Sequence, residues 1–172
     1  NGTMNVLAKI KTKNFIFSST GVAEYCYDPY GTSKKAAEDV VIEYCMSRNV
    51  QDFTIFRFYN VTGTNGYGPT NPDGLISNLL TAPQKGEFTI FGDDYDTRDG
   101  SCIRDYVHVS DIAAANLTVA EKDVEVYGQI YNVGTGRQLP IKRIAEMISN
   151  DIVHIPPRPA EARRSFASTR KI

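Results

Sequence analysis

One strand-to-helix segment near the start of the sequence constrains the fold of this chain more than any other feature. The apolar run 15–17, Phe-Ile-Phe, ends in the polar triplet Ser-Ser-Thr at 18–20. Such a run predicts a buried strand with a polar end. A helix is expected shortly afterwards, because Asp28 can cap it and Pro29 suits its first position.

The same alternation of strand and helix continues along the sequence. Further strands are expected at 53–58, 88–91, 103–109 and 129–133, and helices at 30–46, at 110–121 with Ser110 as the cap, and at 140–148. The stretch 63–74 is rich in Gly, Pro and Asn and predicts a loop, and the tail from 155 predicts irregular structure. The alternation predicts an α/β fold, with helices on the faces of a sheet.

Composition and charge exclude several classes of protein. A chain of 172 residues fits one domain, and its net charge of -1 gives no broad attraction to nucleic acid or to a membrane surface. No apolar run is long enough to cross a bilayer. Three widely spaced cysteines, Cys26, Cys45 and Cys102, indicate reduced thiols in a cytoplasmic protein, and no metal site is expected.

Tyr30 and Lys34 are candidate proton-handling residues. They lie four residues apart at the start of the expected helix, so both project from one face. An ammonium one turn away stabilises a phenolate, and Thr20 at the end of the preceding strand can bind the same substrate oxygen. A Tyr-x-x-x-Lys spacing alone is more often a surface tyrosine beside a solvated lysine. The preceding Ser-Ser-Thr and the Asp-Pro cap favour the catalytic interpretation.

Several motifs together resemble those of one enzyme family. They are Phe-Ile-Phe-Ser-Ser-Thr at 15–20, Pro-Tyr-Gly-Thr-Ser-Lys at 29–34, Arg-Phe-Tyr-Asn-Val-Thr-Gly at 57–63, the long run from Phe91 to Val109, and Tyr-Asn-Val-Gly-Thr-Gly at 131–136. On these residues the chain resembles the extended short-chain dehydrogenase/reductase superfamily, and within it the UDP-hexose (UDP-glucose) 4-epimerases. The run 91–109 is the most specific of these motifs, and the resemblance covers essentially the whole chain.

The resemblance implies an α/β fold with a Rossmann-like parallel sheet and a smaller C-terminal substrate-binding part. Residues 1–62 are then part of an NAD-binding region with the catalytic motif. Residues 63–172 mainly bind the sugar nucleotide, with 103–136 returning to the Rossmann sheet. The family is usually homodimeric through helices such as the one at 30–46. The exposed face of that helix is expected to carry Lys35, Glu38, Asp39 and Glu43, and so shows no apolar stripe.

The resemblance also implies roles for individual residues. It assigns catalysis to Thr20, Tyr30 and Lys34, cofactor binding to Ser18, Tyr30, Lys34 and Tyr59, and substrate binding to Thr20, Asn60, Asn78, Thr89, Phe91, Arg104, Arg158 and Glu161. The two arginines would grip the substrate diphosphate. The alternatives are a salt bridge from Arg104 to Asp105 or Asp111, and a solvated charge at Arg158. His108 is interpreted as structural, and the Gly-Thr-Gly at 134–136 as a turn and not a phosphate loop.

The sequence departs from the family pattern in one main respect. It contains no Gly-x-x-Gly-x-x-Gly turn, so the N-terminal glycine-rich half of the cofactor domain is expected to be absent from this chain. Either the sequence is part of a longer enzyme, the explanation we favour, or the protein is a truncated product. The implied activity is reversible C4 epimerisation of a UDP-hexose through a 4-keto sugar with bound NAD. The alternatives are a nucleotide-sugar 4,6-dehydratase, in which an acidic pair would replace Gly21-Val22, and a truncated inactive sugar-nucleotide-binding module.

Overall fold

The computed structural model describes residues 2–26, 28–48, 52–64, 66, 74–85, 87–121, 128–149, 151–159 and 161–171. In chain order the helices are α1 (Gly2–Lys9), the 3-10 helix η1 (Gly21–Glu24), α2 (Pro29–Arg48), α3 (Leu75–Lys85), α4 (Val109–Glu121) and α5 (Ile141–Glu146). The strands are β1 (Asn14–Thr20), β2 (Asp52–Phe58), β3 (Asn60–Thr62), β4 (Phe88–Phe91), β5 (Ile103–Arg104), β6 (Tyr106–His108), β7 (Gln129–Val133), β8 (Leu139–Pro140), β9 (Ile152–Ile155) and β10 (Arg164–Ser165).

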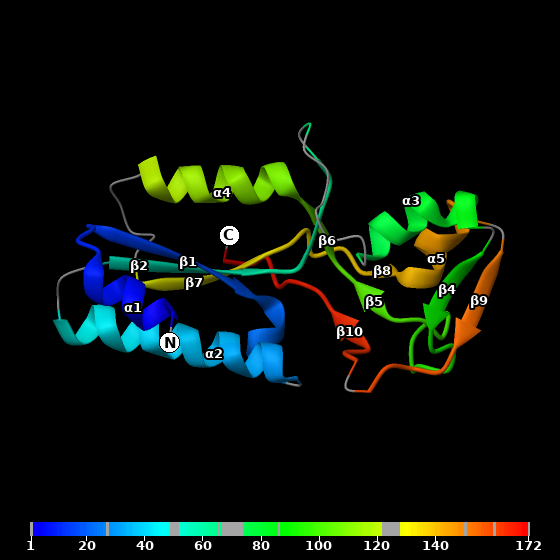
Figure 1. Cartoon of the computed structure of the whole chain (residues 1–172), viewed down its shortest axis with the longest axis horizontal. Helices are drawn as coiled ribbons and strands as arrows, with labels where there is room; N and C mark the ends of the chain where they lie inside the picture. Colours follow the sequence, from blue (N-terminus) through cyan, green and yellow to red (C-terminus); the bar gives the residue numbers. More distant parts are fainter. Residues whose placement is uncertain are drawn as a thin grey trace.

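A three-stranded parallel sheet forms one half of the molecule. Its strand order is β1-β2-β7, with Thr20 opposite Phe58 and Phe58 opposite Val133. Helices α1 and α2 cover one face of the sheet, and α4 covers the other (Figure 1). Because all three strands are parallel, their carboxyl ends meet at one edge, which is where ligands usually bind in α/β sheets. We call this the carboxyl edge.

Two apolar clusters hold the helices onto this sheet. On the α1–α2 side, Leu7 and Val41 pack with Phe53 and Ile55 of β2. On the α4 side, Val119 packs with residues from β2 and β7. Complete burial of such a side chain contributes roughly 1.5–3 kcal/mol, so the first cluster fixes the position of α2 on the sheet and the second fixes that of α4. The position of α2 determines where Tyr30 and Lys34 lie, because this helix carries both residues.

A second group of elements lies beside the carboxyl edge, on the right of Figure 1. Here β4 pairs in parallel with β9, and Leu79, Phe88, Ile90 and Ala145 form a core with α3 and α5. Strand β5 lies between β10 and β8. The short parallel pair β3–β6 follows the sheet strand β2 and precedes α4.

Expected and observed elements agree best in the sheet. The expected strands 53–58 and 129–133 correspond to β2 and β7, and the helix at 30–46 corresponds to α2. The tail from 155 is irregular as expected except for the short strand β10, and α1, α3 and β9 had no counterpart among the expected elements. Most of the loop expected at 63–74 lies outside the described residues.

The expected strand 103–109 is wrong in one informative way. It is divided at Asp105 into β5 and β6, which belong to different sheets. The next helix begins at Val109, and Ser110 is therefore inside it instead of capping it. The cap comes from His108, whose ring Nδ1 accepts the Ser110 backbone N–H at 3.2 Å and lies 2.6 Å from the Ser110 hydroxyl. His108 is thus a structural residue in this fold.

Three properties expected from composition can be compared with the described residues. All three cysteines are free thiols. Within the described ranges, no helix has the length and apolar character that a membrane crossing requires. Nor does the described part of the chain bring together three side chains suited to hold a metal ion.

Candidate active site and substrate cleft

The start of α2 is fixed as its sequence predicts. The Asp28 carboxylate accepts the backbone N–H of Gly31 at 2.5 Å, and the backbone carbonyl oxygen of Asp28 accepts the backbone N–H of Thr32 at 3.0 Å. Asp28 is therefore the helix cap, as expected. Tyr30 lies in this first turn and is 55% exposed, so its phenol is open to a ligand.

Lys34 links α2 to the end of β1. Its ammonium donates to the carbonyl oxygen of Ser18 at 3.1 Å and lies 5.3 Å from the centre of the Phe17 ring. The helix also meets the start of η1, because a Cβ on Gly31 would lie 2.9 Å from Val22. Thr20 ends β1 and caps η1, its hydroxyl accepting the Val22 N–H at 3.4 Å. The structure thus brings Ser18, Thr20, Tyr30 and Lys34 to the carboxyl edge.

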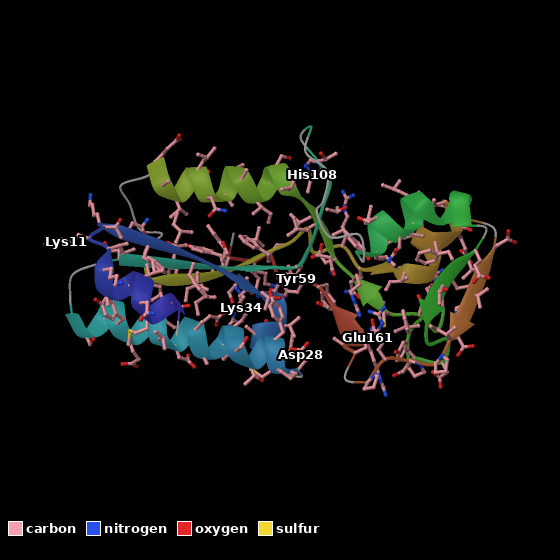
Figure 2. The ribbon with its side chains drawn as sticks, in the orientation of Figure 1. Lys11, Asp28, Lys34, Tyr59, His108 and Glu161 are labelled. Carbon is pink, nitrogen blue, oxygen red and sulfur yellow. The ribbon has the colours of Figure 1, made fainter. Side chains whose placement is uncertain are left out.

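Tyr59 lies at the same edge, directly after β2 (Figure 2). Its backbone N–H donates to Val133 and its ring covers Gly21, where a Cβ would lie 2.5 Å from the ring. Burial is the main reason that the pKa of the Tyr59 phenol is raised to about 12. Among the described residues this buried hydroxyl has no hydrogen-bond partner. A neutral buried donor of this kind is ordinarily paired, so Tyr59 is suited to bind a ligand atom.

Glu38 corrects one expectation about α2. It was expected on the exposed face of the helix, but its side chain is completely buried. Its carboxylate accepts the Ser19 hydroxyl at 2.6 Å and two hydrogen bonds from Arg57, at 2.9 and 2.7 Å. Burial of a carboxylate is favourable only with such partners, and here the partners come from β1 and β2. Glu38 therefore ties α2 to both strands next to the carboxyl edge.

A cleft of about 480 Å³ lies among the elements that follow the sheet. This volume is within the range of small-molecule sites. Its lining includes seven residues expected to bind substrate: Asn60, Asn78, Thr89, Phe91, Arg104, Arg158 and Glu161. They come from β3, α3, β4, β5 and the C-terminal segment, so folding brings together positions up to about a hundred residues apart. The eighth expected substrate residue, Thr20, lies outside this lining at the end of β1.

Arg104 and Glu161 form an ion pair in the cleft wall. The Arg104 guanidinium donates to Glu161 at 3.1 Å and to the carbonyl oxygen of Ala162 at 2.6 Å. The alternative of a salt bridge from Arg104 to Asp105 or Asp111 is therefore wrong. The second carboxylate oxygen of Glu161 is buried and has no hydrogen-bond partner among the described residues. This oxygen is a ready acceptor for a hydroxyl group of a bound molecule.

Arg158 and Phe91 form a flat surface on another wall of the cleft. The Arg158 guanidinium stacks on the Phe91 ring, with its central carbon 3.7 Å from the ring centre. Arg158 is exposed, but the stacking holds its planar guanidinium in place. Arg158 is therefore not a freely solvated charge. Among the described residues its N–H groups make no hydrogen bond, so they can donate to an anionic ligand.

Some cleft residues were not anticipated. Leu75, Glu87, Ile141 and Tyr106 also line the cleft. Tyr106 had a signal in the sequence, because it lies two positions after Arg104 and alternate residues of an extended segment share a side. Burial raises the pKa of its phenol to about 12. No periodic pattern distinguishes Leu75 and Ile141 from ordinary core positions, or Glu87 from an ordinary exposed charge.

Comparison with known proteins agrees with this geometry. Residues 2–134 match the model of the NAD dependent epimerase/dehydratase family. The UDP-glucose 4-epimerase of Homo sapiens is 32% identical over 78% of this chain and 47% of its own length. The chain thus spans about half the length of the curated relatives it matches. The expected absence of a glycine-rich half stays a prediction, because the family match itself begins at residue 2.

Solved structures give the same result. The UDP-glucose 4-epimerase of Bifidobacterium longum, in complex with NAD+ and UDP, superimposes with a TM-score of 0.82 and 25% identity, covering 98% of this chain and 59% of that one. The enzyme of Thermotoga maritima with UDP-glucose gives a TM-score of 0.81 and 28% identity, covering 99% and 60%. The sequence match, the shared fold and the residues gathered at the carboxyl edge agree. The chain belongs to the NAD dependent epimerase/dehydratase family.

Proposed function

We propose that this protein catalyses the reversible C4 epimerisation of a UDP-hexose of the UDP-glucose/UDP-galactose type, through a 4-keto sugar and with NAD as cofactor. The observation that carries this proposal is the cleft, in which seven dispersed residues expected to bind the sugar nucleotide lie together. Such a molecule has an aromatic base, a diphosphate and hydroxyl groups. The cleft offers an aromatic wall, two arginines and a carboxylate oxygen that is unpaired among the described residues for these groups.

The residues of the carboxyl edge fit a nicotinamide cofactor. The Tyr59 hydroxyl is buried and has no hydrogen-bond partner among the described residues. It can therefore donate to a polar substituent of the nicotinamide ring. Tyr59, Ser18, Tyr30 and Lys34 are the residues that would hold the nicotinamide end. When bound there, NAD would accept a hydride from C4 of the sugar and later return it.

Three residues would handle the proton of the sugar 4-hydroxyl. The Tyr30 phenolate removes this proton while C4 is oxidised, and returns it when C4 is reduced. Lys34 supports the phenolate electrostatically, and its ammonium is already held in place by the Ser18 carbonyl oxygen. Thr20 orients the hydroxyl from the end of β1. Arg104 and Arg158 hold the diphosphate, so that the sugar can present either face to the cofactor while UDP stays bound.

The close contact at Gly21 argues against the dehydratase alternative. An acidic residue directly after Thr20 would need a Cβ at position 21, which would lie 2.5–2.8 Å from the Tyr59 ring. Tyr59 would have to move from its buried position to admit it. The structure therefore favours an epimerase over a 4,6-dehydratase. The inactive binding module is distinguished by experiment, because it would bind UDP without holding NAD.

Replacement of Tyr30 tests the proposal. Tyr30→Phe removes only the phenolic oxygen, and we expect turnover of UDP-galactose to fall by about 10²–10⁴-fold while UDP still binds. Tyr44→Phe, the same change later in α2, is the matched control and should keep wild-type turnover. Turnover is followed by an assay coupled to UDP-glucose, and bound NAD by absorbance after reduction. Near-normal turnover of Tyr30→Phe would contradict the assignment.

Assembly and location are also part of the proposal. We expect a homodimer that acts in the cytoplasm, as the family resemblance and the three free thiols suggest. Light scattering during size-exclusion chromatography would measure the assembly. A mass corresponding to one chain, 19.1 kDa, would contradict the expected dimer.

A further inference from the structure

Asp105, between β5 and β6, has a side chain that no step of the proposed reaction uses. Its carboxylate is completely buried. One oxygen, Oδ1, accepts the backbone N–H of Thr135 at 2.9 Å and the Thr135 hydroxyl at 2.6 Å. The other, Oδ2, accepts the N–H of Gly136 at 2.9 Å and that of Ala167 at 3.0 Å. Four neutral donors thus satisfy one buried negative charge.

The turn at 134–136 is shaped around this carboxylate. A Cβ on Gly134 would lie 2.5 Å from Asp105 Oδ2 and 2.7 Å from the Cβ of Ala167, so a side chain there would displace one of them. The successive N–H groups of Thr135 and Gly136 form a concave anion site of the kind that often binds phosphate. In this chain the occupant is a carboxylate of the protein itself, which agrees with the interpretation of 134–136 as a turn.

The main chain of Asp105 organises a third segment. Its carbonyl oxygen accepts both the backbone N–H of Asn60, at 3.1 Å, and the Asn60 side-chain amide, at 3.0 Å. Asn60 lines the cleft, and so do the two neighbours of Asp105, Arg104 and Tyr106. One residue therefore fixes a cleft side chain from β3 and separates two others on its own segment.

The bond to Ala167 extends this control to the C-terminal wall of the cleft. Ala167 follows β10, which pairs in parallel with β5, Ser165 lying opposite Arg104. Glu161 precedes β10 and closes the ion pair with Arg104. Holding Ala167 therefore holds the segment that carries Glu161 at one of its ends.

We propose that Asp105 is a positioning residue for the sugar-nucleotide cleft: it sets Asn60, Arg104 and Glu161 in register with one another. The inference rests on the proposed function for the identity of the ligand, and on the hydrogen bonds above for the mechanism. Its basis is geometric. The three side chains belong to different segments, and Asp105 joins those segments at one buried point. Small displacements of binding groups are enough to weaken ligand contacts strongly.

Asp105→Asn is a sharp test because it keeps the size of the side chain. Each carboxylate oxygen accepts two donors, so either orientation of the amide turns its NH₂ towards two N–H or O–H groups. We expect the dissociation constant for UDP, measured by calorimetry on the full chain, to rise about tenfold or more. Thr135→Val removes one donor only and should raise it about threefold, while Thr135→Ser should retain wild-type binding.

A second measurement separates positioning from loss of stability. Val119→Ala removes buried side-chain volume under α4, outside the cleft lining, and should lower Tm without changing the dissociation constant for UDP. Amide hydrogen exchange at Asn60 and Ala167 should become faster in Asp105→Asn. It should not become faster in Val119→Ala when each variant is measured at the same number of degrees below its own Tm.

The outcomes are distinct. Wild-type affinity for UDP in Asp105→Asn, in a chain that binds UDP, would overturn the inference and leave the proposed function intact. Failure of the wild-type chain to bind UDP would overturn the proposed function. Exchange then decides the inference alone: unchanged protection at Asn60 and Ala167 in Asp105→Asn overturns it, and selective loss of protection at these two residues supports it.

Discussion

Glu38 and Asp105, the two fully buried acidic residues in the described part of the chain, are stabilised in opposite ways. Glu38, in the sheet half, is neutralised by the guanidinium of Arg57 and accepts a further bond from Ser19. Asp105, at the junction with the second group of elements, is surrounded by neutral donors, three of them backbone N–H groups. The first arrangement is made of side chains and can be replaced as a unit. The second is built into the backbone and has no such substitute.

This difference corresponds to the kind of structure that each carboxylate connects. Glu38 lies one turn after Lys34 on α2, and its partners lie on β1 and β2, so it joins the helix with the catalytic pair to the sheet. Its hydrogen bonding is the main reason that the pKa of Arg57 is raised further, so the guanidinium stays charged. Asp105 joins Asn60 of β3, the turn after β7 and the segment after β10, and these three strands belong to different sheets. A charged pair fixes two packed layers, whereas a ring of backbone donors fixes loops.

Breaking the charged pair should have the largest effect. Arg57→Met leaves Glu38 buried without a counter-charge, and we expect a loss of about 3–5 kcal/mol in the free energy of unfolding. Urea unfolding at pH 7 measures it. The double variant Glu38→Met with Arg57→Met removes both charges and should recover most of the loss. If the double variant were as unstable as Arg57→Met, the pair would not be replaceable as a unit.

High pH should have an intermediate effect on both regions, through one buried and one half-buried tyrosine. Tyr59 follows the strand of Arg57 and Tyr106 follows Asp105, and burial raises the pKa of each to about 12. Because the folded pKa exceeds the unfolded value near 10, the stabilising contribution is complete below pH 10 and is lost as pH rises towards 12. We expect each tyrosine to lower the free energy of unfolding by roughly 1–3 kcal/mol over this pH range.

Urea unfolding at pH 9 and pH 11.5 tests this expectation. Tyr59→Phe removes one titrating group, so its free energy of unfolding should fall less between the two pH values than that of the wild type. Equal losses in the two proteins would show that Tyr59 ionises normally in the folded state. Absorbance of phenolate during titration provides an independent check.

The smallest effect is expected next to Glu38 on the same helix. Asp39 forms an exposed ion pair with Lys35, the two side chains being 54% and 40% exposed. Asp39→Asn should change the free energy of unfolding by about 0.3–0.5 kcal/mol, and the difference should vanish in 1 M salt. A loss above 1 kcal/mol that persists in salt would contradict the contrast between buried and exposed carboxylates on α2.

Local signals predicted the part of the fold that local physics determines. Asp28 and Pro29 mark the start of α2, and alternation or apolar runs locate β1, β2 and β7. Burial of Glu38 was missed because its partner Arg57 lies 19 positions away on another element. The division of the expected strand at Asp105 was missed for the same reason, since its donors are about 30 and 60 residues distant.

The candidate site shows the same limit. Tyr30 and Lys34 could be proposed from their spacing, because one helix carries both. The residues of the cleft could be named only through resemblance to a family, since their neighbourhood depends on several chain segments. Tyr106 was accessible to simpler reasoning, from its alternation with Arg104, but that spacing has meaning only once the cleft is known.

The path of the chain through the two groups of elements has a practical consequence. From β2 it passes to α3, returns through β5 and β6 to α4 and β7, leaves again for β8, and comes back after β10, where Lys171 donates to Ile130. No single cut therefore separates a sheet fragment from a cleft fragment. A split reporter or a transplant of the cleft onto another sheet would have to sever several of these crossings, and it would separate Asp105 from the N–H groups of Thr135 and Gly136 that surround it.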